Sequence, residues 1–192
     1  MKFTDAKKKI IQMFDSDDFK QRIRDEDRTM IRHLDILKEI NKYGYLTTES
    51  QAGRKCYKGK KSYFDGKPYE IKERAYISGF MKKDNAEKFI KEMGIYTDKN
   101  ALFTPICSDD ISIPASLDIP LTITIQQDKT EVSTHTSSVI SKSYADMLRK
   151  QVKLNKSEDV VYIFCWDTKW CRNASNKNGL FTDILKVMKK IY

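Results

Sequence analysis

The segment from Val160 to Asn173 constrains the fold more than any other feature of this sequence. Residues 160–166 form an apolar run rich in β-branched and aromatic side chains, which is typical of a buried strand. Residues 167–173 follow at once with a carboxylate, a guanidinium, an amide and a second tryptophan. Because a strand is rigid and the end of a sheet opens into a crevice, such a junction is a common position for a ligand. We therefore expect a polar site where this strand ends.

Helical patterns at both ends of the chain enclose a β-rich middle. Met30, Leu34 and Leu37 recur at helical spacing near the start, and residues 180–191 set a second apolar stripe at the end. Residues 121–125 alternate with period two, as a half-buried strand does. The order predicts an α+β fold, with a mixed or mostly antiparallel sheet flanked by helices. Residues 1–28 are expected to form an N-terminal helical arm, and residues 29–192 a single domain.

Several local signals predict where elements begin and end. Gly44 suits the left-handed conformation that closes a helix, and a short strand at 45–48 is expected to give way to a polar loop. One strand is predicted from about 69 to 80. Asp84 and Glu87 have the spacing of a capping box at the start of a further helix.

The charge of the chain favours polyanionic partners. The 192 residues carry a formal net charge of +9, with a pI near 9.2, which favours nucleic acid, nucleotides or other acidic surfaces. The surplus is concentrated in residues 41–100, where one segment holds five basic residues and no acid. We expect this segment to contact a nucleic-acid backbone through Arg54, Lys55, Lys58, Lys60 and Lys61.

The motifs of several other classes of protein do not occur in the sequence. The four cysteines form no C-x-x-C pair, so no metal site is predicted. There is no phosphate-binding glycine motif, and no cofactor is predicted. No apolar run is long enough to span a bilayer, so no membrane partner is expected. The chain is interpreted as cytoplasmic, with reduced thiols, and as a protein of the host cytoplasm or the virion if it is viral.

Nine residues are candidates for ligand contact because they combine hydroxyl, amide, charged and aromatic groups near predicted strand ends. They are Thr47, Ser50, Gln51, Arg74, Tyr76, Asp167, Trp170, Arg172 and Asn173. The alternative is that Asp167 pairs with Arg172 to tie down the loop, while the tryptophans belong to the core.

Three blocks of the sequence carry a resemblance when they are taken together. They are Gly44-Tyr45-Leu46-Thr47-Thr48-Glu49-Ser50-Gln51, Arg74-Ala75-Tyr76-Ile77-Ser78-Gly79-Phe80, and Trp166-Asp167-Thr168-Lys169-Trp170-Cys171-Arg172-Asn173 leading to Gly179-Leu180-Phe181. These blocks resemble a family catalogued as a domain of unknown function, found in bacteria and large DNA viruses. Its pattern is similar to Leu-Thr-x-x-Ser-Gln, Arg-Ala-x-x-x-Gly-Phe and Asp-x-x-Trp-Gly-Arg-Asn. Cys171 stands where that pattern has glycine. The resemblance implies that the three blocks belong to one framework, and it leaves open whether the framework binds a ligand or locks the fold.

These observations support three functional hypotheses. The first is a binding protein that recognises a nucleotide-like or other anionic ligand, including nucleic acid. The second is an enzyme acting on phosphodiesters or nucleotides, with Asp167 as base or metal ligand and Arg172 stabilising charge. The third is a structural or virion assembly protein, with a protein partner contacting the N-terminal helices.

Overall fold

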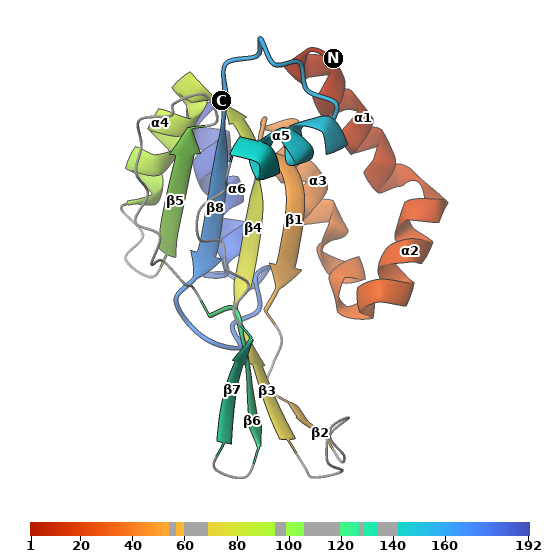
Figure 1. Ribbon diagram of the computed structural model, residues 1–192, viewed down its shortest axis with the longest axis vertical. Coiled ribbons are helices and arrows are strands. Elements are labelled where there is room, and N and C mark those ends of the chain that lie inside the picture. The colour runs from red at the N-terminus through yellow and green to blue at the C-terminus, as the bar shows by residue number, and fades with distance from the viewer. Residues whose placement is uncertain (54–56, 60–68, 95–98, 106–119, 127–128, 134–141) are drawn as a thin grey trace.

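The structure, a computed structural model, contains two antiparallel sheets surrounded by helices (Figure 1). Both sheets have four strands, and every strand pair in them is antiparallel. The predicted α+β class with antiparallel pairing is confirmed. The described residues are 1–53, 57–59, 69–94, 99–105, 120–126, 129–133 and 142–192.

The first sheet forms the centre of the molecule and has the strand order β1-β4-β8-β5. Its two inner strands are buried along almost their whole length, as the apolar run at 160–166 predicts. β1 lies at one end of the sheet, so only one of its edges is paired with another strand of the sheet. The four strands are β1 (Leu46–Ala52), β4 (Ala75–Lys82), β8 (Val160–Asp167) and β5 (Lys99–Pro105).

The second sheet extends away from the end of the first (Figure 1). It has the order β2-β3-β6-β7 and is joined to the first sheet at Arg74, which separates β3 from β4. The backbone N–H of Arg74 donates to the carbonyl oxygen of Leu121, 2.8 Å away, just before β6. Its strands are β2 (Tyr57–Gly59), β3 (Tyr69–Glu73), β6 (Thr122–Gln126) and β7 (Lys129–Ser133).

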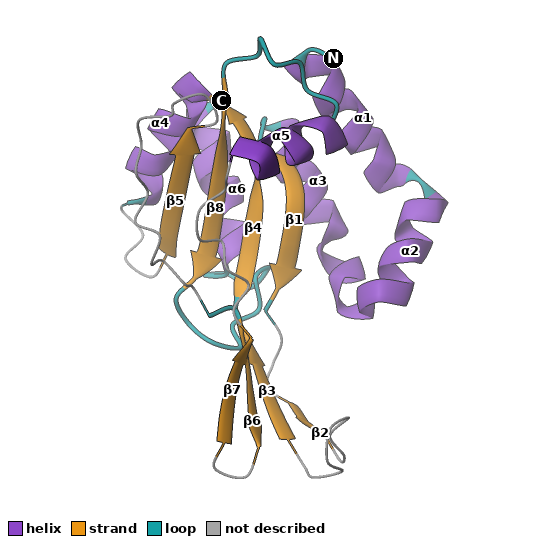
Figure 2. Ribbon diagram, in the orientation of Figure 1, coloured by secondary structure: helices purple, strands orange, loops and turns teal. Residues whose placement is uncertain are grey.

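Helices cover both faces of the first sheet (Figure 2). α3, α4 and α6 lie behind the strands in this view, whereas α5 crosses in front of them. The stripe predicted for the last helix is confirmed, because Leu180, Ile184, Val187 and Met188 are all buried. The helices are α1 (Phe3–Asp15), α2 (Asp17–Asp27), the 3₁₀ helix η1 (Arg28–His33), α3 (Leu34–Lys42), α4 (Lys83–Met93), α5 (Lys142–Gln151) and α6 (Leu180–Ile191).

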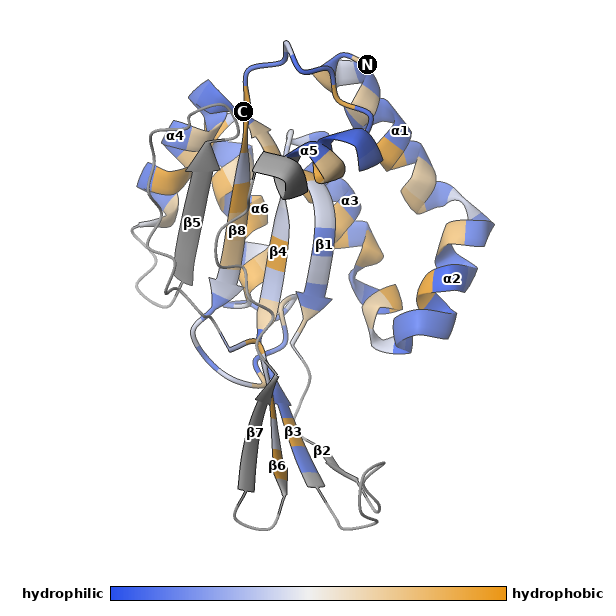
Figure 3. Cartoon of the chain, viewed as in Figure 1, coloured by the Kyte–Doolittle hydropathy of each residue, from blue (hydrophilic) through white to orange (hydrophobic). Residues whose placement is uncertain are grey.

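The two N-terminal helices differ in how they meet the core. α1 buries Phe3, Ala6, Ile10 and Phe14, which recur every three or four residues and so lie on one face. Ser16 ends α1 and caps α2, since its hydroxyl oxygen accepts from the backbone N–H of Phe19 at 3.2 Å. α2 buries no residue, and Figure 3 shows that much of its surface is hydrophilic.

Three local predictions are wrong, and each error has a physical cause. The strand expected at 69–80 is two strands of different sheets, because Arg74 bonds to Leu121 instead of continuing either ladder. The loop expected at 49–53 instead continues β1 as far as Ala52, since pairing with β4 overrides its polar composition. The expected capping box is missing, because α4 starts at Lys83 without a side-chain cap.

Gly44 confirms the prediction made for it, with φ +84° after α3. Within the described residues, no helix has both the length and the apolar composition that crossing a bilayer requires.

Candidate functional site

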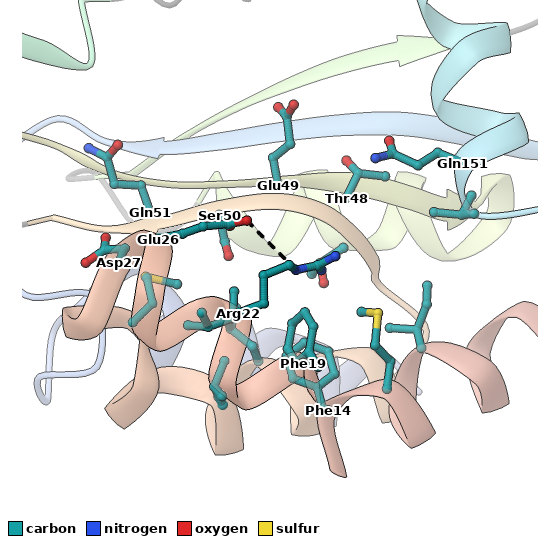
Figure 4. Close-up of a pocket in the computed structure, with 18 of the residues that line it drawn as sticks. Phe14, Phe19, Arg22, Glu26, Asp27, Thr48, Glu49, Ser50, Gln51 and Gln151 are labelled. Carbon is teal, nitrogen blue, oxygen red and sulfur yellow. Dashed lines mark ion pairs between the residues drawn. The ribbon is translucent and has the colours of Figure 1, made fainter. Parts of the chain in front are cut away.

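The main cavity of the described residues lies between the N-terminal helices and β1, and has a volume of about 560 Å³ (Figure 4). This is within the range of ligand-binding pockets in proteins. The helices supply an apolar wall, and the sheet supplies hydroxyl, amide and carboxylate groups. The lining comprises Ile10, Met13, Phe14, Phe19, Arg22, Ile23, Glu26, Asp27, Met30, Leu34, Leu37, Thr47, Thr48, Glu49, Ser50, Gln51, Tyr76, Gln151 and Val152.

Five consecutive residues of β1, from Thr47 to Gln51, line this cavity. Successive side chains of a strand point to opposite faces, so a cavity on one face would touch only alternate residues. A cavity that touches all five must run along the edge of the strand. This edge is the one that has no neighbouring strand in the sheet.

The main chain of Ser50 points toward the cavity. The carbonyl oxygen of Ala52 accepts from the N–H of Ala174 at 2.8 Å, so Ala52 directs its backbone groups away from β4. Along an edge strand of an antiparallel sheet, residues whose backbone groups bond to the neighbouring strand alternate with residues whose backbone groups point away from it. The backbone groups of Glu49 and Gln51 therefore bond to β4, and those of Ser50 point away from β4 as those of Ala52 do. Within the described residues, no group outside the sheet bonds to the main chain of Ser50. Ser50 therefore offers one N–H and one C=O at this edge.

The open edge is short because both of its ends are occupied. Residues of the loop after β8 cover Ala52 at one end. At the other end, the pairing with β4 shifts between Thr47 and Glu49, which marks a β-bulge at Thr48. The hydroxyl of Thr48 lies 3.4 Å from those of Ser78 and Tyr162. Only Glu49–Gln51 remains as regular open edge.

The wall opposite β1 is apolar. Phe14 and Phe19 meet edge to face, with ring centroids 5.4 Å apart. Phe19 and Ile23 are half-buried and project from α2 into the cavity. Met30 extends this wall from η1. The apolar residues of α2 therefore pack against the edge of the core and also line the cavity.

The charged lining of the cavity is predominantly acidic. Among the described residues its one cation is Arg22, which lies 3.9 Å from Glu26 across one turn of α2 (Figure 4). Asp27 caps η1, accepting from the backbone N–H of Thr29 at 3.0 Å. With Glu49, the lining holds three acids and one base, a formal charge of −2 in a chain that carries +9. An anionic ligand is disfavoured here.

The polar residues predicted to cluster after β8 do lie together, and Asp167 and Arg172 bond to each other within the turn. Asp167 is 0% exposed, and its carboxylate accepts from Arg172 Nε at 2.6 Å and from the backbone N–H of Lys169 at 2.9 Å. A second guanidinium nitrogen of Arg172 also contacts this carboxylate. The pair closes the turn after β8, and Asp167 lies in no open cleft where it could act as a base.

Arg74 links this turn to the junction between the sheets. Its guanidinium lies over the ring of Trp170, with 4.2 Å between the central carbon and the ring centroid. The side-chain amide of Gln51 donates to the Arg74 carbonyl oxygen at 3.1 Å. Burial lowers the pKa of Arg74, and the nearby charge of Asp167 opposes this change. The three blocks identified in the sequence therefore meet in space.

The nine candidate residues fall into two groups. Four of them, Thr47, Ser50, Gln51 and Tyr76, line the cavity. Thr47 also anchors β1 to α3, because the side-chain amide of Asn41 donates to its hydroxyl at 2.9 Å. The other five lie around the turn after β8 and do not line this cavity: Arg74, Asp167, Trp170, Arg172 and Asn173.

The predicted nucleic-acid contacts cannot be placed. Arg54, Lys55, Lys60 and Lys61 lie outside the described residues, and for Lys58 only the backbone in β2 is described. The cavity residues of α2 were not among the residues predicted from the sequence. The signal was present, since Phe19 and Ile23 are its only apolar residues and lie one turn apart.

His33 connects η1 to the turn before α6 and is 1% exposed. Its Nε2 accepts from Arg32 Nε at 3.1 Å, so the neutral ring carries its proton on Nδ1, which donates to the Ser175 hydroxyl at 2.6 Å. In this tautomer Nδ1 cannot take the proton of Ser175, so the pair is not arranged for nucleophilic catalysis. Burial, together with the charge of Arg32, lowers the pKa of His33 to about 4.

The described cysteines differ in state. Cys171 is disulfide-bonded and adopts φ +59°, whereas Cys165 is free and buried. Burial raises the pKa of the Cys165 thiol to about 12. The expectation of reduced thiols is wrong for Cys171. The cytoplasmic location, from which that expectation followed, stays a prediction. The left-handed conformation of Cys171 also explains why glycine would suit this position.

Comparison with known proteins gives no relative: no protein-family model matches the chain, and a search of curated proteins finds no match. Among the described residues, no group of three or more His, Cys, Asp or Glu side chains could hold a metal ion. The geometry and charge of the cavity therefore carry the functional argument.

Protonation of His33 is expected to destabilise the protein. Because its pKa is about 4 in the folded chain and 6.5 in the reference state, the unfolded chain binds the proton first as the pH falls. Neutral His33 should contribute on the order of 3 kcal/mol to the free energy of unfolding. This contribution should be complete above pH 6.5, decline as the pH falls below that value, and be lost near pH 4. Urea unfolding from pH 7 to 4 of the protein and of His33→Asn tests this. Equal pH slopes would contradict it.

The strain at Cys171 can be measured with two variants that both remove the disulfide. Cys171→Gly should be more stable than Cys171→Ser by about 1 kcal/mol, because glycine adopts positive φ without steric cost. Urea unfolding of the two variants measures the difference. A serine variant as stable as the glycine variant would show that this turn is not strained.

Proposed function

We propose that this chain is a binding module that takes an extended segment of a partner protein along the open edge of β1. In this mode the guest adds a strand to the sheet, and its main chain bonds to the exposed backbone groups. The observation that carries the proposal is that five consecutive residues of an end strand line one cavity.

The loop after β8 supports the proposed strand addition because part of this loop already bonds to the same edge of β1. Ala174 donates its N–H to Ala52, as a neighbouring strand would. A guest lying beside Ser50 would continue the bonding that Ala174 begins. The bulge at Thr48 limits the guest to a short segment, since a bulge interrupts regular pairing.

The cavity also bears on the position of α2, which contacts mainly η1 and α1 among the described residues. An element that buries no side chain gains little from the hydrophobic effect. Its half-buried Phe19 and Ile23 would gain contacts once a guest fills the space between α2 and β1. A guest would thus give these partly exposed side chains a second contact surface beside the core that they already touch.

Substitution of Ser50 by proline tests the proposal. Proline removes the outward N–H while leaving the bonds to β4, so Ser50→Pro should alter stability by only about 1 kcal/mol. It should weaken binding of peptides selected from a displayed random library about tenfold, as judged by fluorescence anisotropy. Ser50→Ala, which keeps the N–H, should bind normally.

Two further outcomes decide the case. Gln51→Pro removes an N–H that bonds to β4, so this variant should lose about 3 kcal/mol of stability. Such a loss would confirm that the backbone N–H of Gln51 faces β4 and that the N–H of Ser50 faces the cavity. If no peptide is enriched, or if Ser50→Pro binds as well as the unmodified protein, strand addition at this edge is wrong.

A second candidate function, binding of a phosphate-bearing polyanion, is favoured by an arginine pair where α2 ends and η1 begins. Arg24 and Arg28 lie one turn apart and, with Ile31, line a hollow of about 450 Å³. Within the described residues, neither arginine pairs with an acid. Guanidinium groups bind phosphate in a bidentate manner, so this surface fits the anionic ligand inferred from the charge of the chain.

The paired substitution Arg24→Gln with Arg28→Gln tests this surface against a labelled single-stranded oligonucleotide. Affinity for the oligonucleotide should fall about tenfold. The slope of log affinity against log salt concentration should become shallower by about 1 to 2. Lys8→Gln with Lys9→Gln, on α1, removes the same charge and should have a smaller effect. An equal loss in both double variants would show that only net charge matters.

A further inference from the structure

We propose that the guest is a single extended segment bound along both of its edges, with Ser50 on one side and Arg22 and Glu26 of α2 on the other. This inference rests on the proposed strand addition and names the class of partner. The partner supplies an unfolded segment, and not the edge strand of a folded sheet.

The N-terminal helices close the space beyond β1. Figure 1 shows α2 on the side of β1 that faces away from β4, and residues of both elements line the same cavity. The labelled residues of α2 follow the cavity in the same order as those of β1 (Figure 4). A partner sheet would continue past its own edge strand at a spacing of about 4.8 Å per strand, and α2 lies in that direction. A guest strand beside β1 would therefore have α2, and not a further strand, at its outer edge.

A strand in this position has an outer edge that needs hydrogen-bond partners. Backbone N–H and C=O groups of alternate guest residues would point at β1, and those of the residues between them would point at α2. Backbone groups enclosed without a partner cost free energy, so α2 must supply both donors and acceptors. Phe19 and Ile23, which line the cavity from α2, cannot do so.

Arg22 and Glu26 have the groups that such an edge requires. Their side chains are 61% and 66% exposed, and Figure 4 shows both in the space between α2 and β1. Arg22 Nε lies 3.9 Å from a Glu26 oxygen, which is beyond hydrogen-bond distance. The guanidinium also lies over the ring of Phe19, with 5.3 Å between its central carbon and the ring centroid. Within the part of the chain that the structure describes, neither charged side chain makes a hydrogen bond.

The spacing and charge of this pair suit a peptide backbone. One turn of helix advances about 5.4 Å and alternate residues of a strand lie about 6.7 Å apart, so the pair can reach successive groups along one edge. Arg22 would donate to a guest carbonyl oxygen, and Glu26 would accept from a guest N–H. Because the two charges offset each other, the pair favours neutral peptide groups over a charged side chain.

The form of the guest tests the inference. The tightest peptide from the displayed library is synthesised as a linear chain and within two cyclic β-hairpins, each of which pairs one of its two edges. The protein should bind the linear peptide about tenfold more tightly than either hairpin, as measured by fluorescence anisotropy. A site that is open on its far side would instead bind one hairpin at least as tightly, because the hairpin is already extended.

Variants of α2 test the residues assigned to the outer edge. Arg22→Met keeps a long unbranched side chain beside Phe19 but removes the donors, so it should weaken binding of the linear peptide about tenfold. Glu26→Met removes the acceptor and should have a similar effect. Lys20→Met removes the same charge as Arg22→Met from α2, outside the cavity lining, and should change the affinity by less than about twofold.

A hairpin that binds as tightly as the linear peptide, or equal losses in Arg22→Met and Lys20→Met, would overturn the groove with two bonded edges. Strand addition itself would survive that result if Ser50→Pro still weakened binding. If Ser50→Pro bound the linear peptide normally, both proposals would fall together.

Discussion

A strand at the end of a sheet has backbone N–H and C=O groups with no neighbouring strand to bond, and the rest of this structure is arranged around that constraint at β1. Soluble proteins cover, bulge or shorten such edges because an open edge pairs with other chains. Here Ala174 covers Ala52 and a bulge interrupts the strand at Thr48. Between them, within the part of the chain that the structure describes, the helices enclose the edge without bonding to its main chain, and Ser50 faces the cavity.

The polar turn after β8 has a structural part in this arrangement. The buried Asp167–Arg172 pair fixes the turn, and Arg74 stacks on Trp170 at the point where the two sheets meet. Gly53 makes the close approach feasible, since a Cβ there would lie 2.5 Å from the carbonyl oxygen of Arg172. The turn thus holds Ala174 against β1, and so determines where the open edge begins. Removing the buried charge pair would be expected to disturb the edge as well as the fold.

Much of the fold followed from periodicity, whereas the site did not. Residues 160–166 and 180–191 have unambiguous periods and formed the expected strand and helix. Residues 49–52 were predicted to be a loop because they are polar. They are polar because they line a cavity at the edge of a strand, and the local sequence pattern does not indicate that position. The break at Arg74 depends on a bond to Leu121, 47 residues away in the chain. Asp167 and Arg172 were correctly grouped, but sequence alone could not separate a buried lock from a ligand site.

Hydrogen exchange at the amide of Ser50 tests the central claim most directly. The amides of Glu49 and Gln51 should exchange slowly because they bond to β4, and that of Ser50 should exchange much faster, becoming slow when a peptide binds. Site-resolved NMR exchange with and without a selected peptide measures all three. A Ser50 amide already as protected as its neighbours in the free protein, or one that stays unprotected with peptide bound, would contradict an open edge that receives a guest strand.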